Sequence, residues 1–138
     1  MNFLIDTNVI SEARKPQPDP NVVRWILKHE GQLFLSVITV AELRFGVERL
    51  ASSEHRHRLE AWVHRVVEGF GDRVLPVDKD VAQTWGSVMA KSEQAGRRMA
   101  PMDCFVAATA LVWDLTLATR DVTGFAGFNG RLMNPWEA

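Results

Sequence analysis

Four short apolar runs, separated by longer segments of mixed polarity, dominate the hydrophobic pattern of the chain. Runs of three or four apolar residues bounded by polar or turn-forming residues are typical of buried strands. We therefore predict strands at residues 3–5, 33–35, 74–77 and 115–118, with a candidate fifth strand near residues 131–133. Because Pro76 has no backbone N–H to donate, the third strand is expected at an edge of its sheet.

The segments between these runs show helical periodicity and residues typical of helix boundaries. Asp19 followed by Pro20 is a typical helix start, and Gly31 and Gly96 are typical residues just beyond a helix end. We predict helices over residues 7–14, 20–30, 39–50, 53–69 and 103–113. One further helix is capped by Asp78 or Asp80 and runs to about residue 94.

Alternation of short apolar strands with helices predicts an α/β fold. Its centre should be a mainly parallel sheet of four or five strands, flanked by helices on both faces in a three-layer sandwich. No repeat, low-complexity segment or linker divides the chain, so residues 1–138 are expected to form a single domain. In such sheets ligands bind beyond the carboxyl ends of the strands, so the residues just after each strand are the ones to inspect.

Composition restricts the class of protein. Hydrophobic residues make up 46% of the chain and charged residues 24%, as in globular proteins. There is no signal peptide, no apolar run of the ~20 residues that span a bilayer, and only one cysteine, so we expect a cytoplasmic protein. The net charge of −1 lacks the excess of basic residues typical of nucleic-acid enzymes, but two bound Mg²⁺ ions would make it +3.

Four acidic residues lie just after strands or in the first turns of helices: Asp6, Glu42, Asp103 and Asp121. If the sheet forms as predicted, these carboxylates converge at one end of it. Like charges at close range raise one another's pKa, and a hard divalent cation such as Mg²⁺ or Mn²⁺ removes that cost. A metal held there could activate a water and stabilise the charge that develops on a phosphodiester.

Each acid also has a purely structural explanation. Asp6 could cap the helix that follows it, and Thr39 with Glu42 matches a capping box. Asp103 could complement a helix dipole, and Asp121 could begin a turn. Position relative to the strands therefore does not by itself separate catalysis from structure.

The residues around the acids form four motifs. They are Leu4-Ile5-Asp6-Thr7-Asn8-Val9-Ile10, Ser36 to Gly46 around Glu42, Met102 to Ala110 around Asp103, and Leu117 to Asp121 followed by Phe125. Their order and spacing resemble those of PIN-domain nucleases over nearly the whole chain. The short length and the Asn134-Pro135-Trp136 ending are most similar to VapC or FitB-type toxins of type II toxin–antitoxin systems.

This resemblance implies a PIN fold and an Mg²⁺- or Mn²⁺-dependent endoribonuclease that hydrolyses RNA with a metal-activated water. Asp6, Glu42, Asp103 and Asp121 fall on the family's catalytic and metal-binding positions. Thr7 and Thr119 would help to hold the metal site or the substrate. The resemblance also implies a homodimer and a cognate antitoxin, a small DNA-binding protein whose C-terminal tail blocks the active site.

Two basic pairs are candidates for contacts with RNA phosphates. Arg14-Lys15 follows the first acidic motif, and Arg97-Arg98 precedes Asp103. Such contacts give salt-dependent affinity without reading sequence. Solvated loops would explain both pairs equally well.

Other functions fit parts of the pattern. A metal-dependent DNA nuclease or phosphatase would use the same chemistry, because it acts on any phosphate ester. A PIN module that binds RNA without cutting it is a second alternative. A receiver domain also carries acids at strand ends, but it needs an acidic pair after its first strand and a lysine near its last. Here only Asp6 follows the first strand, and Arg120 lies near the fourth.

Overall fold

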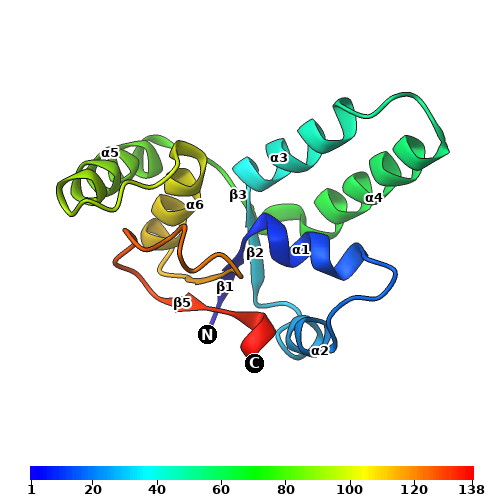
Figure 1. Cartoon of the computed structure of the whole chain (residues 1–138), viewed down its shortest axis with the longest axis horizontal. Helices are drawn as coiled ribbons and strands as arrows, with labels where there is room; N and C mark the ends of the chain where they lie inside the picture. The colour runs from blue at the N-terminus through cyan, green and yellow to red at the C-terminus, as the bar shows by residue number, and fades with distance from the viewer.

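A computed structural model describes all residues from 1 to 138 and contains a five-stranded parallel sheet flanked by helices (Figure 1). The strands are β1 (Phe3–Ile5), β2 (Leu33–Ser36), β3 (Val74–Leu75), β4 (Thr116–Ala118) and β5 (Leu132–Met133). Their order across the sheet is β3-β2-β1-β4-β5, and every neighbouring pair is parallel. The expected α/β class, the candidate fifth strand and the edge position of the strand before Pro76 are therefore confirmed.

Six α-helices and one 3₁₀ turn lie between the strands, and a second 3₁₀ turn follows β5. They are α1 (Thr7–Arg14), α2 (Pro20–Lys28), α3 (Val37–Glu48), α4 (Glu54–Phe70), η1 (Gly71–Arg73), α5 (Lys79–Gln94), α6 (Pro101–Val112) and η2 (Pro135–Glu137). None of the helices combines the length and the hydrophobicity needed to cross a membrane.

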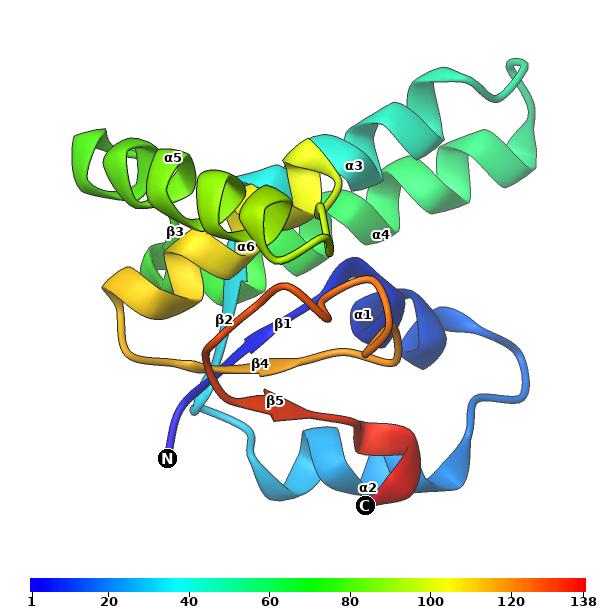
Figure 2. The same ribbon diagram turned by 60° about the vertical axis from the view of Figure 1, so that its left-hand side comes forward.

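Successive residues of each strand point to opposite faces of the sheet. Both sets of side chains are buried because helices cover both faces. Leu4 and Leu117 pack with residues of α5 and α6 on one face. Phe3 and Ile5 pack with residues of α1 and α2 on the other. The two turned views show α5 and α6 together on one side, and α3 and α4 as an antiparallel pair that extends away from the sheet (Figures 1 and 2).

Local capping explains most of the helix starts. Asp19 caps α2, with its Oδ1 accepting from the Asn21 amide at 2.8 Å, as the sequence predicts. Asp78 caps α5 in the same way, through Oδ1 and the Val81 amide at 2.9 Å. Both carboxylates have a structural role.

The start of α3 differs from the prediction. The helix begins at Val37, capped by the Ser36 hydroxyl, which accepts from the Ile38 amide at 3.0 Å. Thr39 lies inside the helix and is fully buried, and its hydroxyl has no hydrogen-bond partner. The capping-box explanation of Glu42 is therefore wrong, because the cap is Ser36, three residues before Thr39, and Glu42 lies in the second turn of the helix.

Candidate active site

Asp6 is the most buried of the four acids, with 7% of its surface exposed at the end of β1. Its Oδ1 accepts from the Thr7 amide at 2.9 Å, so Asp6 does cap α1. Its Oδ2 accepts from the Thr119 hydroxyl at 2.8 Å and from the Asn8 amide group at 3.4 Å. Capping therefore occupies one carboxylate oxygen, while the other oxygen bonds to the segment that follows β4.

Glu42 is exposed on α3 and is joined to the same region by Thr7. The Thr7 hydroxyl donates to Glu42 Oε1 at 2.9 Å, across 35 residues of sequence. Thr7 thus contacts Asp6 with its backbone and Glu42 with its side chain. These two bonds place Thr7 between Asp6 and Glu42, and its supporting role at the site stays a prediction.

Thr119 connects Asp6 with the fourth acid, Asp121. Its buried hydroxyl donates to Asp6 and accepts from the Asp121 backbone amide at 3.0 Å. The Asp121 side chain is exposed, and its Oδ1 accepts from the Gly124 amide at 2.9 Å, as the turn explanation requires. A Cβ at Gly124 would lie 2.2 Å from Asp121 Oδ2, so a larger residue there would displace the Asp121 carboxylate from this position.

Sequence reasoning did not assign a role to Asn8, although it lies within the first motif. Its side-chain amide donates to the Thr119 hydroxyl at 3.2 Å, and its carbonyl oxygen accepts from the Arg120 amide at 3.3 Å. Asn8 therefore links the start of α1 to the segment after β4. Its position two residues after Asp6 was the only available signal.

Burial and neighbouring carboxylates raise the pKa of three of the four acids, Asp103, Asp6 and Glu42. Burial raises the pKa of the Asp103 carboxyl to about 6, and the charges of Asp6, Glu42 and Asp121 add to the effect. Burial also raises the pKa of Asp6, against the hydrogen bonds from Thr119 and Thr7 and with a smaller contribution from Asp121. Hydrogen bonds through Thr7 and Thr119 connect Asp6 with Glu42 and with the segment that carries Asp121, and Asp103 on α6 lies close enough for their charges to raise its pKa.

Glu42 behaves in the same way at the rim of the group. Partial loss of hydration on the side that faces the protein raises its pKa, the hydrogen bond from Thr7 opposes this, and the charge of Asp6 adds to it. None of the ion pairs in the structure includes any of the four acids. The negative charge at this end of the sheet is therefore not neutralised by a lysine or arginine.

This donor set suits a hard divalent cation. All the donors are oxygens, and clustered carboxylates without a basic partner gain most from a bound metal. No group of three or more His, Cys, Asp or Glu side chains is arranged to hold an ion by itself. Mg²⁺ usually keeps several waters and takes only one or two carboxylates directly, so the residues present fit that ion.

The basic residues predicted to contact RNA lie outside this group. Lys15 pairs with Glu12 at 2.8 Å, and Arg14 lies over the Trp62 ring at 5.6 Å. Arg98 pairs with Glu93 at 2.8 Å, and Arg97 is exposed in the loop between α5 and α6. None of the four forms an ion pair with an acid of the cluster.

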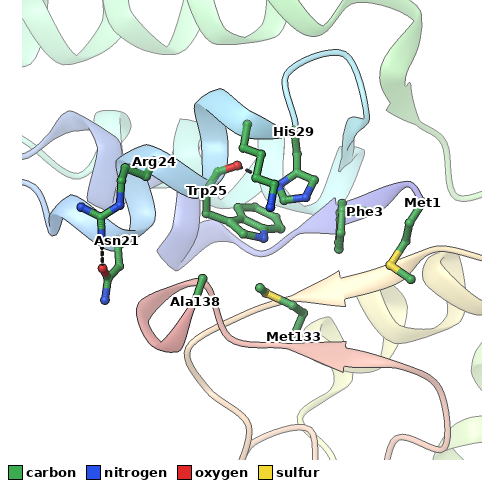
Figure 3. Close-up of a pocket in the computed structure, with 9 residues that line it drawn as sticks. Met1, Phe3, Asn21, Arg24, Trp25, His29, Met133 and Ala138 are labelled. Carbon is green, nitrogen blue, oxygen red and sulfur yellow. Dashed lines mark hydrogen bonds between the residues drawn. The ribbon is translucent and has the colours of Figure 1, made fainter.

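Two cavities of similar size differ in their relation to the acids. One, of about 550 Å³, lies along α3, where Glu42, Phe45, Gly46 and Arg49 line it together with Thr7 and Met102; we call it the α3 cavity. The second, of about 580 Å³, lies beside α2 and the C-terminus (Figure 3). Because Phe3, Trp25 and Met133 line this second cavity and no acid does, cavity size alone does not locate the site.

Comparison with known proteins identifies the family. The PIN domain family model matches residues 3–126. The chain is similar to a VapC ribonuclease of Sinorhizobium fredii, with 38% identity over 98% of each chain. It is also similar to toxin FitB of Neisseria gonorrhoeae, with 40% identity over 98% of this chain and 99% of that one.

A solved structure supports the same assignment. In the structure of FitAB bound to a DNA fragment, one chain superposes with a TM-score of 0.90 and 36% identity, over 97% of this chain and 95% of that one. Sequence and fold therefore agree over nearly the full length, and the matched region contains all four acids. The chain belongs to the PIN-domain family and, within it, to the VapC/FitB toxins of toxin–antitoxin systems.

Proposed function

We propose that this VapC-type ribonuclease is an endoribonuclease that depends on Mg²⁺, with Mn²⁺ able to substitute. Asp6, Glu42, Asp103 and Asp121 would hold the ion, one or two of them directly and the others through its waters, and are the catalytic residues. The observation that carries the proposal is the proximity of four carboxylates: the charges of Asp6, Glu42 and Asp121 add to the rise in the pKa of Asp103, and no lysine or arginine forms an ion pair with any of the four.

The bound ion supplies an activated water and positive charge for the phosphodiester. The protein's own residues fix where the carboxylates lie. Thr7 hydrogen-bonds to both Asp6 and Glu42, and Thr119 hydrogen-bonds to Asp6 and to the backbone of Asp121. Thr7 and Thr119 are therefore positioning residues, because both contact the acids directly.

Substrate binding in this proposal also uses the exposed basic residues. Arg97 forms no ion pair, so its guanidinium is free to meet a phosphate. Arg98, Lys15 and Arg14 would exchange the contacts with Glu93, Glu12 and Trp62 for contacts with RNA. RNA as the substrate and the single buried Cys104 are both consistent with action in the cytoplasm.

The family relationship supports a second component of the proposal. The FitAB structure contains a toxin relative of this chain in a complex that binds DNA. We propose that this chain likewise forms a homodimer and binds a small DNA-binding antitoxin whose C-terminal tail blocks the acidic site.

The test is an incubation of the purified chain with mixed cellular RNA and Mg²⁺ or Mn²⁺, with EDTA controls. Asp6→Asn keeps the size of the side chain and removes one charge from the cluster. Asp78→Asn is the matched control, because Asp78 also follows a strand and asparagine caps helices as well as aspartate does. We expect metal-dependent cleavage by the wild type and by Asp78→Asn, and none by Asp6→Asn.

Other outcomes would redirect the assignment. Equal cleavage by all three proteins would identify a contaminating ribonuclease. RNA binding without cleavage would favour a non-cleaving PIN module. Preferred cleavage of DNA, or release of phosphate from small esters, would favour a DNA nuclease or a phosphatase.

A further inference from the structure

The α3 cavity adjoins the acidic cluster but is not explained by it. Thr7 and Glu42 border both, so a polymer whose phosphate lies at the acids would extend into this cavity. Its volume of about 550 Å³ lies within the ~300–1,000 Å³ range of sites for small organic groups. The cavity is thus large enough for a nucleotide adjacent to the cleaved bond.

Phe45 gives the cavity an exposed aromatic wall. This side chain is 65% exposed, although a phenylalanine on a helix is usually placed toward a core. Phe45 lies three residues after Glu42 and therefore on the same face of α3, ~4.5 Å further along the axis. An exposed aromatic ring beside a phosphate-binding centre is the arrangement on which nucleic-acid bases stack.

No contact within the chain explains why position 46 is a glycine. It lies in the interior of α3, where glycine costs about 1 kcal/mol relative to alanine. A Cβ on Gly46 would meet no atom within 4 Å, so no neighbouring element requires its absence. Because Gly46 also lines the cavity, the missing side chain leaves room for something outside the chain to approach the helix.

Arg49 places a positive charge at the far end of the cavity. Its guanidinium lies 5.6 Å from the centre of the Phe45 ring and forms no ion pair with an acidic residue. Arg49 follows Glu42 by seven residues, ~10 Å along the same face of the helix. A cation stacked beside an aromatic ring fits a base and its phosphate better than it fits a wholly apolar ligand.

From these features we propose that the α3 cavity binds a nucleotide of single-stranded RNA that flanks the cleaved bond. The base stacks on Phe45, its sugar-phosphate backbone passes over Gly46, and Arg49 contacts the next phosphate. This inference rests on the proposed function in one respect, since RNA must lie at the acids for the flanking nucleotide to reach the cavity. Stacking accepts any base, so the site contributes affinity more than sequence preference.

Binding and cleavage are measured separately, so that the two proposals can fail independently. Binding is followed by fluorescence anisotropy with a labelled single-stranded RNA of about 12 mixed nucleotides, in Mg²⁺ and over a range of salt. The Asp6→Asn protein is the parent, because it should leave the RNA intact. Phe45→Ala, Phe45→Trp, Arg49→Ala and Arg49→Lys are added to this parent. Trp113→Ala is the matched control, because Trp113 is a 47% exposed aromatic at the opposite end of α6 from Asp103.

We expect Phe45→Ala to weaken binding about 5- to 150-fold and Phe45→Trp to restore it, because tryptophan also stacks. Arg49→Ala should lower the slope of log affinity against log salt by about 0.7, and Arg49→Lys should retain the slope. Trp113→Ala should bind as the parent does. If Phe45 had a purely structural role, the larger tryptophan side chain would not restore RNA binding.

Three results would overturn the proposal. The first is an RNA affinity that Phe45→Ala leaves unchanged. If the wild type cleaves RNA, this result does not affect the endoribonuclease assignment. The second is absence of RNA binding by the parent. The third is a smaller mass for Phe45→Ala in sedimentation equilibrium, which would assign this exposed face to a second copy of the chain. Loss of cleavage by the wild type, with the expected binding results, would overturn the endoribonuclease assignment alone.

Discussion

Asp103 provides a direct test of the electrostatics of the acidic cluster. Burial and the charges of Asp6, Glu42 and Asp121 raise its pKa from 3.8 to about 6 in the metal-free protein. A carboxyl whose pKa is higher in the folded state is less stable there as an anion than in the unfolded chain. Its unfavourable contribution is absent below pH 3.8 and fully present above about pH 6, so the metal-free protein should lose stability between those values.

Replacing Asp103 with asparagine should therefore stabilise the metal-free protein at neutral pH. A pKa rise of this size corresponds to about 3 kcal/mol if it is fully expressed in folding. Asp103 is only partly buried, and solvent screening reduces the expected gain to about 1–2 kcal/mol, or roughly 3–8 °C in Tm. The same substitution should abolish metal-dependent RNA cleavage, because it removes one metal-binding charge.

The assay is urea unfolding at pH 7.5 and pH 4.5, in EDTA and in Mg²⁺. Asp72→Asn is the control, because Asp72 is exposed and forms no ion pair. In EDTA the advantage of Asp103→Asn over the wild type should be larger at pH 7.5 than at pH 4.5, while Asp72→Asn should behave like the wild type. Mg²⁺ at ten times its Kd should stabilise the wild type by about 1.4 kcal/mol and the variant by less. Equal or lower stability of Asp103→Asn in EDTA at pH 7.5 would refute the reasoning.

Two further predictions concern the support of the site and the approach of RNA. Thr119→Val removes the hydroxyl that donates to Asp6 and accepts from the Asp121 amide. Thermal unfolding should show a free energy of unfolding lower by about 1–3 kcal/mol, and RNA cleavage should slow. Wild-type stability and rate in this variant would mean that the Thr119 bonds do not support the site. Joint replacement of Arg97 and Arg98 by alanine should lower the slope of log RNA affinity against log salt by up to about 1.4. An unchanged slope would mean that neither residue contacts the RNA.

Local sequence determined much of this protein. Continuous apolar runs produced the buried strands, and Asp19 and Asp78 cap helices as predicted because capping involves only neighbouring amides. The four motifs also identified the acids that the fold brings together, since each motif fixes a strand or helix end and the side chain beside it. Their roles in metal binding and catalysis remain predictions.

Tertiary structure decided what those side chains contact. Glu42 fits a capping box with Thr39 in the sequence, yet it bonds to Thr7, because β1 and β2 are neighbours and α3 begins at Val37 with Ser36 as its cap. The bonds that connect Asn8 and Asp6 with Thr119 span more than 100 residues and depend on β4 pairing with β1. The periodicity of one segment contains no information on such pairings, since they are set by the packing of the whole sheet. The α3 cavity likewise exists only because α3 and α6 are in contact, which places Met102 and Phe45 around the same cavity.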